Sequence, residues 1–373
     1  MGSPIWWAFF TEICQKVKFL ASVSYTKPMI VCKFGGTCCT HRNAAKVKAI
    51  LDENRRVVVV SAVGKTHPSD VKVTDLLIDL HNSLPNTDIF NQIALKYQKL
   101  AKTCQYTQID SLLSSTITDI VSKNSYHNTL SKGEEMSARI FAGYLNYPYV
   151  DAEDLLAFDD NGINLDKSFF QVNYALRHYG KFITGGFYGA GSCGRVTFSR
   201  GGSDVSASII ASALNACLYE NFTDVNGVCV ASPSQVSLPQ TVRCISYDDM
   251  YLMARLGANV LHPDAVTMAK LGKVPINVRN LFVPTDYGTI VSSASSPSQV
   301  LGITQQQANN AYVTNVIHSV DGFCLLTTLL NCLVNQPDLQ VFSVSQSDNL
   351  ISISTNLPII KAIYNCLLTN GAI

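Results

Sequence analysis

The chain has 373 residues and nearly balanced charge, with 28 Lys and Arg against 27 Asp and Glu. Because no basic cluster occurs, we expect no nucleic-acid partner. The length suffices for about two domains with substantial cores. The 12 cysteines are scattered, without Cys-x-x-Cys pairs or Cys/His ligand spacing. This usage predicts reduced thiols in an intracellular, cytoplasmic protein rather than a disulfide framework or a zinc site.

Residues 1–27 form a segment of their own ahead of the first strand signal. Its apolar residues recur on one helical face: Ile5, Trp6, Phe9, Phe10, Ile13, Val17 and Leu20. The segment is too short and too polar to span a membrane, and it lacks the basic start of a secretory signal. We expect an amphipathic helix that packs on the protein or on a second subunit. Contact with a membrane, or a role as an organelle address, remains open.

From residue 28 strand-like and helix-like stretches alternate, which predicts an α/β domain with a largely parallel central sheet between helices. The expected strands are 30–33, 57–61, 147–151, 182–185 and 216–223, and the clearest helices are 43–54 and 88–104. Glycine-rich turns follow several of these strands. We therefore expect a ligand cleft at the carboxyl ends of the sheet.

The first such turn reads Lys33-Phe34-Gly35-Gly36-Thr37. Backbone N–H groups of a glycine turn and one lysine ammonium together suit the oxygens of a phosphate. The order differs from the Walker P-loop, in which the lysine follows the glycines. We predict that Lys33, Gly35, Gly36 and Thr37 bind phosphate; the alternative is a solvated lysine at a strand end.

A second turn, Ser199-Arg200-Gly201-Gly202-Ser203-Asp204, precedes an apolar helix. Its glycines allow the backbone to approach a ligand, and Ser203 or Asp204 is expected to cap the helix. The N–H groups at the helix start favour an anion, and the Arg200 guanidinium suits a carboxylate or a phosphate. Taken alone, the pattern is equally typical of a simple turn and cap.

Together with other motifs in the same order, these turns resemble the aspartate kinase family of the amino-acid kinase superfamily. The matching motifs span roughly residues 29–290 and are Lys-Phe-Gly-Gly-Thr at 33–37, Val-Val-Ser-Ala-x-Gly-Lys at 59–65, Lys-Val-Thr-Asp-Leu-Leu at 72–77, Gly-Glu at 133–134, Gly-Phe-Tyr-Gly at 186–189, Ser-Arg-Gly-Gly-Ser-Asp at 199–204, Thr-Asp-Val-x-Gly at 223–227, Gly-Ala-x-Val-Leu-His-Pro at 257–263 and Asn-Val-Arg-Asn at 277–280. The resemblance implies the amino-acid kinase fold. It also implies transfer of the ATP γ-phosphate, with Mg²⁺, to the side-chain carboxylate of L-aspartate, giving 4-phospho-L-aspartate for lysine, threonine and methionine synthesis.

The resemblance also implies roles for individual residues. Lys33 would neutralise the transferred phosphate, and Asp204 would orient that lysine or the substrate amine. Arg200 would pair with the α-carboxylate of aspartate, and Glu134 with its α-amino group. The remaining implied residues are Ser61, Thr74 and Ser203 for the substrate, and Gly201, Gly202, Thr223 and Asp224, beside the first turn, for the nucleotide.

Two side chains within or beside these motifs are expected to take no part in binding or catalysis. Glu135 follows Glu134 on a helix and is expected to point away as a surface charge. His262 precedes a proline and is expected to be structural, because this transfer needs no imidazole. No residue is assigned as a metal ligand.

The nucleotide side departs from the family pattern. Ser232 stands where the family commonly has an acid, Ser234 where it has an arginine, and Asn259 where many relatives have a lysine. Losing two cations near a triphosphate would cost a few kcal/mol of ATP binding if nothing compensates. A second hypothesis therefore stays open, in which the chain is a catalytically weak, amino-acid-binding regulatory or structural subunit. The intact Lys33 favours the active kinase. A related kinase acting on glutamate or a carbamate is a third option, which the motifs disfavour.

A Ser/Pro-rich stretch at 292–298 predicts a domain boundary. We thus expect an extension (1–27), a catalytic domain (28–292) and a small domain (293–373). The last reads strand, helix 322–334, strand 339–345, strand 350–355 and helix 358–368. This β-α-β-β-α order resembles an ACT domain, of which the family usually carries two. We expect a homodimer through this region, which serves either as a dimerisation sheet or as an effector site.

Overall fold

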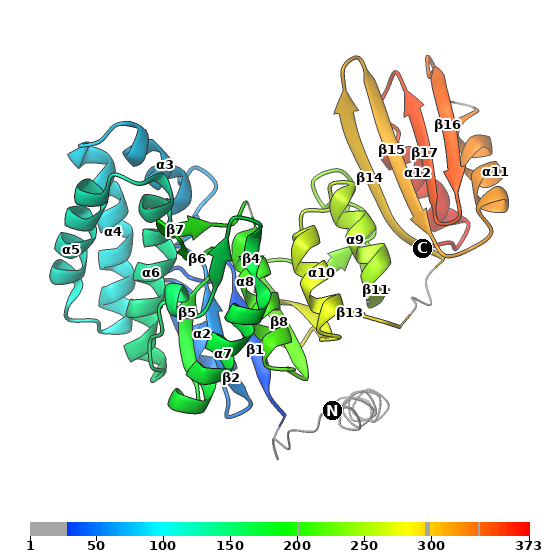
Figure 1. Ribbon diagram of the computed structural model, residues 1–373. Coiled ribbons are helices and arrows are strands. Elements are labelled where there is room, and N and C mark those ends of the chain that lie inside the picture. Colours follow the sequence, from blue (N-terminus) through cyan, green and yellow to red (C-terminus); the bar gives the residue numbers. More distant parts are fainter. Residues whose placement is uncertain (1–27, 200, 295–298, 335) are drawn as a thin grey trace. The chain divides into compact units, whose positions relative to one another are not determined.

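The computed structural model describes residues 28–199, 201–294, 299–334 and 336–373 (Figure 1). The predicted amphipathic segment 1–27 and Arg200 lie outside the described residues. The chain divides into two compact units, one up to Asp224 with Leu271–Ile276, the other Val225–Lys270 with Asn277–Ile373. The boundary predicted at 292/293 stays a prediction. No helix in the described part of the chain is long and apolar enough to cross a membrane.

Four parallel strands form the centre of the first unit, in the order β8-β1-β2-β5. They are β1 (Ile30–Phe34), β2 (Arg55–Val60), β5 (Phe182–Gly185) and β8 (Leu218–Thr223). Their β-branched and aromatic residues are almost all buried, as in a parallel sheet covered on both faces. These four strands confirm the largely parallel sheet expected from the sequence.

The strand predicted at 147–151 is wrong: only an isolated bridge joins Tyr149 to Ile183. Pro148 has no N–H to donate to a ladder. Asp151 then turns the chain, because its side chain accepts the backbone N–H of Glu153 at the start of a short 3₁₀ helix, η1 (Ala152–Asp154).

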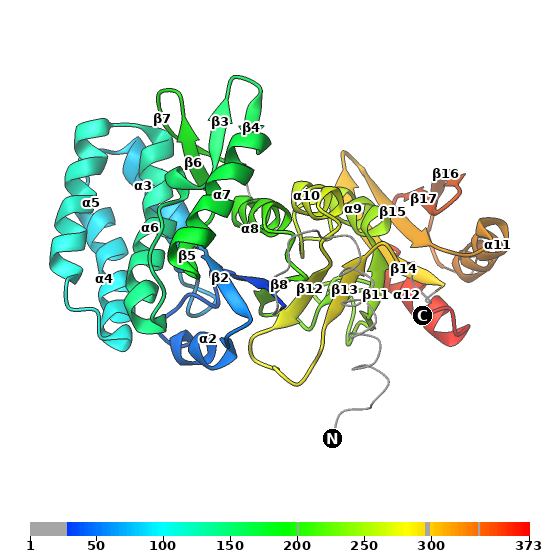
Figure 2. The same ribbon diagram turned by 60° about the horizontal axis from the view of Figure 1, so that its bottom comes forward.

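Helices lie around this sheet, some directly against its strands and others against a helix that covers it (Figure 2). They are α2 (Ala44–Ile50), α3 (Val73–Asn82), α4 (Thr87–Cys104), α5 (Ile109–Lys123), α6 (Tyr126–Leu145), α7 (Leu165–Tyr179) and α8 (Gly202–Ala213). α6 packs against β5 and α8 against β1. α2 is shorter than the predicted 43–54, because Leu51 leaves the helical region and Asp52 accepts the N–H groups of the next turn.

A smaller sheet in the first unit has the order β4-β3-β6-β7. Its strands are β3 (Ala157–Asp159), β4 (Gly162–Asn164), β6 (Tyr188–Gly191) and β7 (Gly194–Thr197). β6 and β7 form an antiparallel hairpin. β7 leads directly into the segment 199–204, which the sequence predicts to bind a ligand.

Short elements follow Asp224, all in the second unit except Leu271 and Ile276: β9 (Val228–Cys229), β10 (Thr241–Val242), β11 (Cys244–Ser246), α9 (Tyr247–Arg255), α10 (Pro263–Leu271), β12 (Ile276–Asn280) and β13 (Thr289–Ser292). β11 and β13 pair in parallel. A four-stranded antiparallel sheet follows in the order β14-β15-β17-β16. Its elements are β14 (Val300–Ala308), β15 (Ala311–His318), α11 (Gly322–Leu333), β16 (Val341–Ser347), β17 (Leu350–Thr355) and α12 (Ile360–Thr369).

This C-terminal part differs from the sequence expectation in two ways. It has two strands, not one, before its first helix, because Asn309 takes φ +54° and turns the chain between β14 and β15. Asparagine tolerates this left-handed conformation better than most residues. In addition, a disulfide joins Cys332 on α11 to Cys366 on α12, against the expectation of reduced thiols only. The pairing of these two helices, which brings the cysteines together, cannot be read from their spacing in the sequence.

Candidate active site

A cleft of about 1180 Å³ opens at the carboxyl ends of the central strands, and its lining belongs entirely to the first unit. All the residues implied by the sequence motifs that the structure describes line it: Lys33, Gly35, Gly36, Thr37, Ser61, Thr74, Glu134, Gly201, Gly202, Ser203, Asp204, Thr223 and Asp224. Motifs that lie far apart in the sequence therefore meet at one place. The individual roles of these residues stay predictions.

The turns after β1 and β2 touch through their backbones. Gly64 donates its N–H to the carbonyl oxygen of Gly36 at 2.8 Å. A Cβ atom added to Gly64 would lie 2.4 Å from the carbonyl carbon of Gly36. Only glycine lets the two turns approach so closely, and their approach places the backbone of the Gly35-Gly36 turn beside Ser61.

We expect Gly64→Ala to destabilise the protein by about 1–3 kcal/mol, because the added methyl group must push the two turns apart. The same shift displaces the Gly35-Gly36 turn and lowers any activity of the cleft. Thermal unfolding and turnover measure both effects. Gly143→Ala is the matched control, since nothing lies within 4 Å of its added Cβ and alanine is the better helix former in α6. An unchanged Gly64→Ala protein would contradict this close packing.

Lys33 contributes a buried positive charge to the cleft. Its Nζ lies 2.6 Å from Asp204 Oδ1 of α8 and 3.4 Å from Asn221 Oδ1 of β8. Asn221 also donates to Asp204 Oδ1 at 3.1 Å. Burial alone would lower the pKa of Lys33, but the Asp204 carboxylate outweighs it and the pKa lies above its ordinary value. The cleft therefore holds a fixed, fully charged ammonium group.

Sequence reasoning missed Asn221, although its strand was recognised. Asn221 lies directly opposite Lys33 in the β1–β8 ladder. It is a buried polar residue two positions before Thr223 of the Thr-Asp motif. A polar residue inside a strand expected to be buried was the available signal. Tyr126 and His127, at the start of α6, also line the cleft and belong to none of the motifs.

Glu134 of α6 presents a buried carboxyl group to the cleft. One oxygen accepts the backbone N–H of Ala62 at 3.1 Å, and the other has no partner among the described residues. Burial raises the pKa of Glu134 to about 8, although the Ala62 N–H and the Lys33 charge oppose the rise. A buried acceptor without a partner is costly, so this oxygen is suited to a donor that arrives with a ligand.

The start of α8 corrects one expectation. The N-cap residue is Gly201, with φ +78° and no side-chain cap, whereas Ser203 and Asp204 lie in the first helical turn. The Asp204 side chain cannot cap the helix because Lys33 and Asn221 hold it. Position 202 has no room for a side chain, since a Cβ atom added to Gly202 would lie 2.6 Å from the Cβ atom of Phe198. The predicted capping role of Ser203 or Asp204 is therefore wrong.

Glu135 corrects a second expectation, because it is buried rather than exposed. It pairs with Lys132 at 2.9 Å, Arg139 at 3.0 Å and Arg195 at 2.5 Å. Burial would raise the pKa of this carboxyl, but the Arg195 and Lys132 charges outweigh it and lower the pKa to about 2. The reason is that α3, α4, α5, β5 and β7 surround α6, so the helix has no free face at this point.

On the nucleotide side, the Thr223 hydroxyl donates to Asp224 Oδ1 at 3.1 Å at the end of β8. In the second unit, the hydroxyl groups of Ser232 and Ser234 hydrogen-bond to each other at 2.8 Å. These two residues stand where the family pattern has an acid and an arginine.

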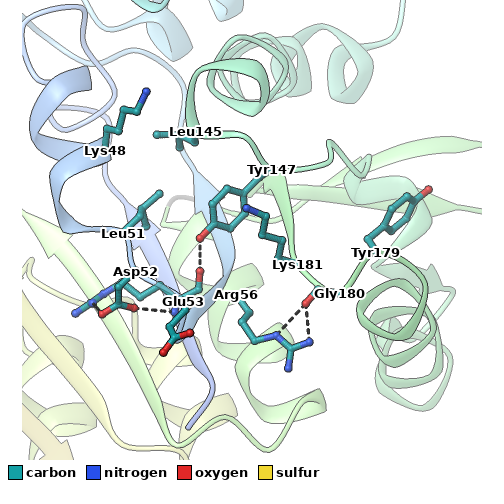
Figure 3. Close-up of a pocket in the computed structure, with 11 residues that line it drawn as sticks. Lys48, Leu51, Asp52, Glu53, Arg56, Leu145, Tyr147, Tyr179, Gly180 and Lys181 are labelled. Atoms are coloured by element: carbon teal, nitrogen blue, oxygen red, sulfur yellow. Dashed lines mark hydrogen bonds and ion pairs between the residues drawn. The ribbon is translucent and has the colours of Figure 1, made fainter. Parts of the chain in front are cut away.

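A second pocket, of about 570 Å³, lies at the opposite ends of β2 and β5 (Figure 3). Its polar groups are largely engaged within the protein. The Arg56 guanidinium donates twice to the Gly180 carbonyl, at 2.9 and 2.6 Å. Lys181 lies over the ring of Tyr147 at 4.3 Å from its centroid. No motif residue that the structure describes lines this pocket, so we locate the candidate active site in the first cleft.

Comparison with known proteins agrees with this location. A model described as the amino acid kinase family matches residues 28–280. Aspartokinase 2 of Bacillus subtilis is 31% identical over 338 residues, which cover 87% of this chain and 74% of that protein. The chain belongs to the amino acid kinase family.

Further relatives of this amino acid kinase are also aspartokinases. Aspartokinase 3 of Bacillus subtilis is 33% identical over 289 residues, covering 71% of this chain and 64% of that protein. The chain thus spans less than two thirds of that relative's length. The Clostridium acetobutylicum aspartate kinase superposes with a TM-score of 0.78 at 25% identity, over 91% of this chain and 99% of that one. Aspartokinase III of E. coli, solved with aspartate and ADP, shares the fold with a TM-score of 0.68 at 22% identity, over 92% and 83%. The expected amino-acid kinase fold is confirmed.

Proposed function

We propose that the chain is an aspartate kinase that transfers the γ-phosphate of ATP to the side-chain carboxylate of L-aspartate. The observation that carries this proposal is the fixed Lys33 ammonium beside two glycine turns, in the same cleft as the unpartnered oxygen of Glu134. Relatives named aspartokinases, and a structure of the same fold solved with aspartate and ADP, support it.

The chemistry of the transfer matches what the cleft offers. The side-chain carboxylate of aspartate is ionised at pH 7, so its attack on phosphorus needs no general base. The reaction needs alignment of the reactants and neutralisation of crowded negative charge. Lys33 supplies a positive charge, and the backbone N–H of Gly36 is suited to donate to a phosphate oxygen. The N–H of Gly35 instead donates to the Phe222 carbonyl oxygen at 3.1 Å and holds the turn against β8. Mg²⁺ bound to the ATP phosphates would add further neutralisation, and the Asp204 and Asp224 carboxylates in the lining are oxygen donors of the type that fits it.

Recognition of the amino acid would rest on opposite charges. In this proposal Glu134 accepts the α-ammonium group, whereas Arg200, which lies outside the described residues, pairs with the α-carboxylate. The hydroxyl groups of Ser61, Thr74 and Ser203 line the same cleft and are suited to hydrogen-bond the reacting carboxylate. Such a clamp favours an amino acid over a plain dicarboxylate.

We expect the purified protein with MgATP to release ADP in the presence of L-aspartate. With succinate in place of aspartate, we expect kcat/KM to be at least about 100-fold lower. Succinate lacks the ammonium group and leaves the buried Glu134 oxygen unpaired, which costs a few kcal/mol. A coupled assay of ADP release, with L-glutamate as a second comparison, measures this. Equal rates with succinate and aspartate would contradict the proposed role of Glu134.

The second candidate is an amino-acid-binding subunit with weak catalysis. Ser234 and Asn259, which replace an arginine and a lysine of the family pattern, favour it. The retained Lys33–Asp204 pair opposes it, because a protein that only binds an amino acid has little use for a phosphate-binding lysine. Calorimetric binding of aspartate together with absent turnover would support this second candidate.

We also propose a homodimer through the C-terminal sheet, which in its strands and helices resembles an ACT domain. Within the described part of the chain, β16 is an edge strand that pairs only with β17, and all its residues are exposed, including Val341, Phe342 and Val344. An exposed apolar edge strand is a template for pairing with a second copy. We expect the mass in solution to be that of a dimer, and Phe342→Glu to shift it toward the monomer, as measured by light scattering. A monomeric wild-type protein at micromolar concentration would contradict this.

A further inference from the structure

The β6–β7 hairpin is tied to helix α6 by a buried arginine, Arg195. Arg195 lies in β7, five residues before Arg200, and Glu135 follows Glu134 on α6. The side chains of Arg195 and Glu135 are only 5% and 9% exposed. Along the chain, the pair thus adjoins two parts of the proposed amino-acid site, the Glu134 carboxyl and the turn that follows β7.

One guanidinium group reaches carboxylates on two separate segments. Nη1 of Arg195 lies 2.5 Å from Glu135 on α6 and donates to Ser131 at 2.9 Å. Nη2 lies 3.0 Å from Asp151, and Nε lies 2.9 Å from Glu153 as an ion pair without hydrogen-bond geometry. Asp151 and Glu153 belong to the segment at η1. Arg195 therefore joins β7 to α6 and to the η1 segment at a single point.

A second contact fixes β7 two residues further on. The imidazole Nδ1 of His127, at the start of α6, lies 2.8 Å from the Thr197 hydroxyl and accepts the Thr197 N–H at 3.3 Å. Residues 195 and 197 lie on the same face of β7, because side chains alternate along a strand. Both contacts join the same strand to the same helix, so β7 cannot slide or rotate against α6 without breaking them.

A buried ion pair adds little net stability, because desolvation offsets the attraction between the charges. The planar, forked guanidinium group of Arg195 nevertheless fixes the relative positions of the groups it binds, since each nitrogen requires an acceptor in a set direction. The geometry fixed here is the position of the turn after β7 relative to Glu134. A displacement of about 1 Å in a reacting group can cost about 100-fold in rate.

From these contacts we propose that Arg195, acting through Glu135, is a positioning residue that sets the spacing between the Glu134 carboxyl and the Ser199–Asp204 turn. This inference rests on the proposed aspartate kinase function, in which that spacing determines how tightly the amino acid is held. It assigns a function to Glu135, which the sequence predicted to be a surface charge.

The test compares Arg195→Lys and Glu135→Gln with the control Arg139→Ala. Arg139 also pairs with Glu135, but it is 41% exposed and belongs to α6 itself, so it does not hold β7. We expect the first two variants to raise the KM for aspartate about 10- to 100-fold, with the KM for ATP changed less than about twofold. The control should keep both values. If Arg195→Lys lowers only the melting temperature and the active fraction, with the KM for aspartate unchanged, the residue is merely structural and the proposal is wrong.

A second readout does not depend on activity. Hydrogen exchange of backbone amides reports local opening. We expect faster exchange in residues 194–204 of Arg195→Lys and Glu135→Gln, but not of Arg139→Ala. Unchanged exchange in that segment would overturn the proposal even in an active enzyme. If the wild-type protein has no aspartate kinase activity, faster exchange still supports the tie between β7 and α6, so failure of the proposed function and failure of this inference are distinguishable.

Discussion

Lys33→Ala is expected to lower kcat for phosphate transfer by about 1000-fold or more, the size of effect produced by cations that stabilise the charge of a transferring phosphoryl group. Lys33 is suited to this function because Asp204 and Asn221 hold its ammonium group in the cleft and keep it charged. Aspartate binding, measured by calorimetry, should be largely retained, since the proposed contacts to the amino acid come from other residues. Lys48→Ala, in the second pocket, is the control for removing a lysine.

Stability must be measured alongside, because Lys33→Ala leaves the buried Asp204 carboxylate without its counter-charge. Breaking a buried ion pair in this way costs about 3–5 kcal/mol. The double variant Lys33→Met with Asp204→Asn removes both charges and keeps similar volumes, so it should fold better and still be inactive. Full activity in folded Lys33→Ala would show that Lys33 does not act on the phosphate.

Glu134→Gln is expected to raise the KM for aspartate about 10- to 150-fold, which corresponds to the loss of one charged hydrogen bond of about 1.5–3 kcal/mol. The effect on kcat should be smaller, because the ammonium group does not take part in the transfer. Steady-state kinetics at constant pH separate the two parameters. A variant with an unchanged KM for aspartate would place the ammonium group elsewhere.

The raised pKa of Glu134 adds two pH signatures. The carboxyl titrates near 8 in the folded protein against 4.5 as its ordinary value, so the folded state holds the proton more tightly. Its contribution to stability therefore falls as pH rises from about 4.5 to about 8. Glu134→Gln lacks this loss, so its melting temperature should exceed that of the wild type more at pH 8 than at pH 5.

In the wild type, the KM for aspartate should fall as pH rises toward 8, because the ammonium group binds the ionised carboxylate of Glu134. A flat profile would contradict this.

The central strands and the cleft could be predicted because their signals are local. The β-branched runs of β1 and β2 and the glycine turns after them depend on neighbouring residues alone. The motifs then brought the cleft residues together, since parallel strands place their carboxyl ends at one edge of a sheet. The structure adds the physical reason for some of the glycines, namely the contact between Gly36 and Gly64.

Features that depend on tertiary packing could not be predicted. Glu135 is polar and follows a cleft residue, and only the elements around α6 show that it is buried among cations. Asn221 gains its importance from its place opposite Lys33. The first unit is discontinuous, since the chain leaves after Asp224 and returns for Leu271–Ile276. A composition change such as the Ser/Pro-rich stretch cannot reveal a unit of that kind.

The most direct test of the proposed function is to trap the acyl phosphate with hydroxylamine after incubating the wild-type protein with ATP, Mg²⁺ and L-aspartate. The proposed function predicts aspartyl hydroxamate, formed in step with ADP and absent from the Lys33→Ala reaction. No hydroxamate from a folded protein that binds aspartate would contradict the kinase and favour the regulatory subunit.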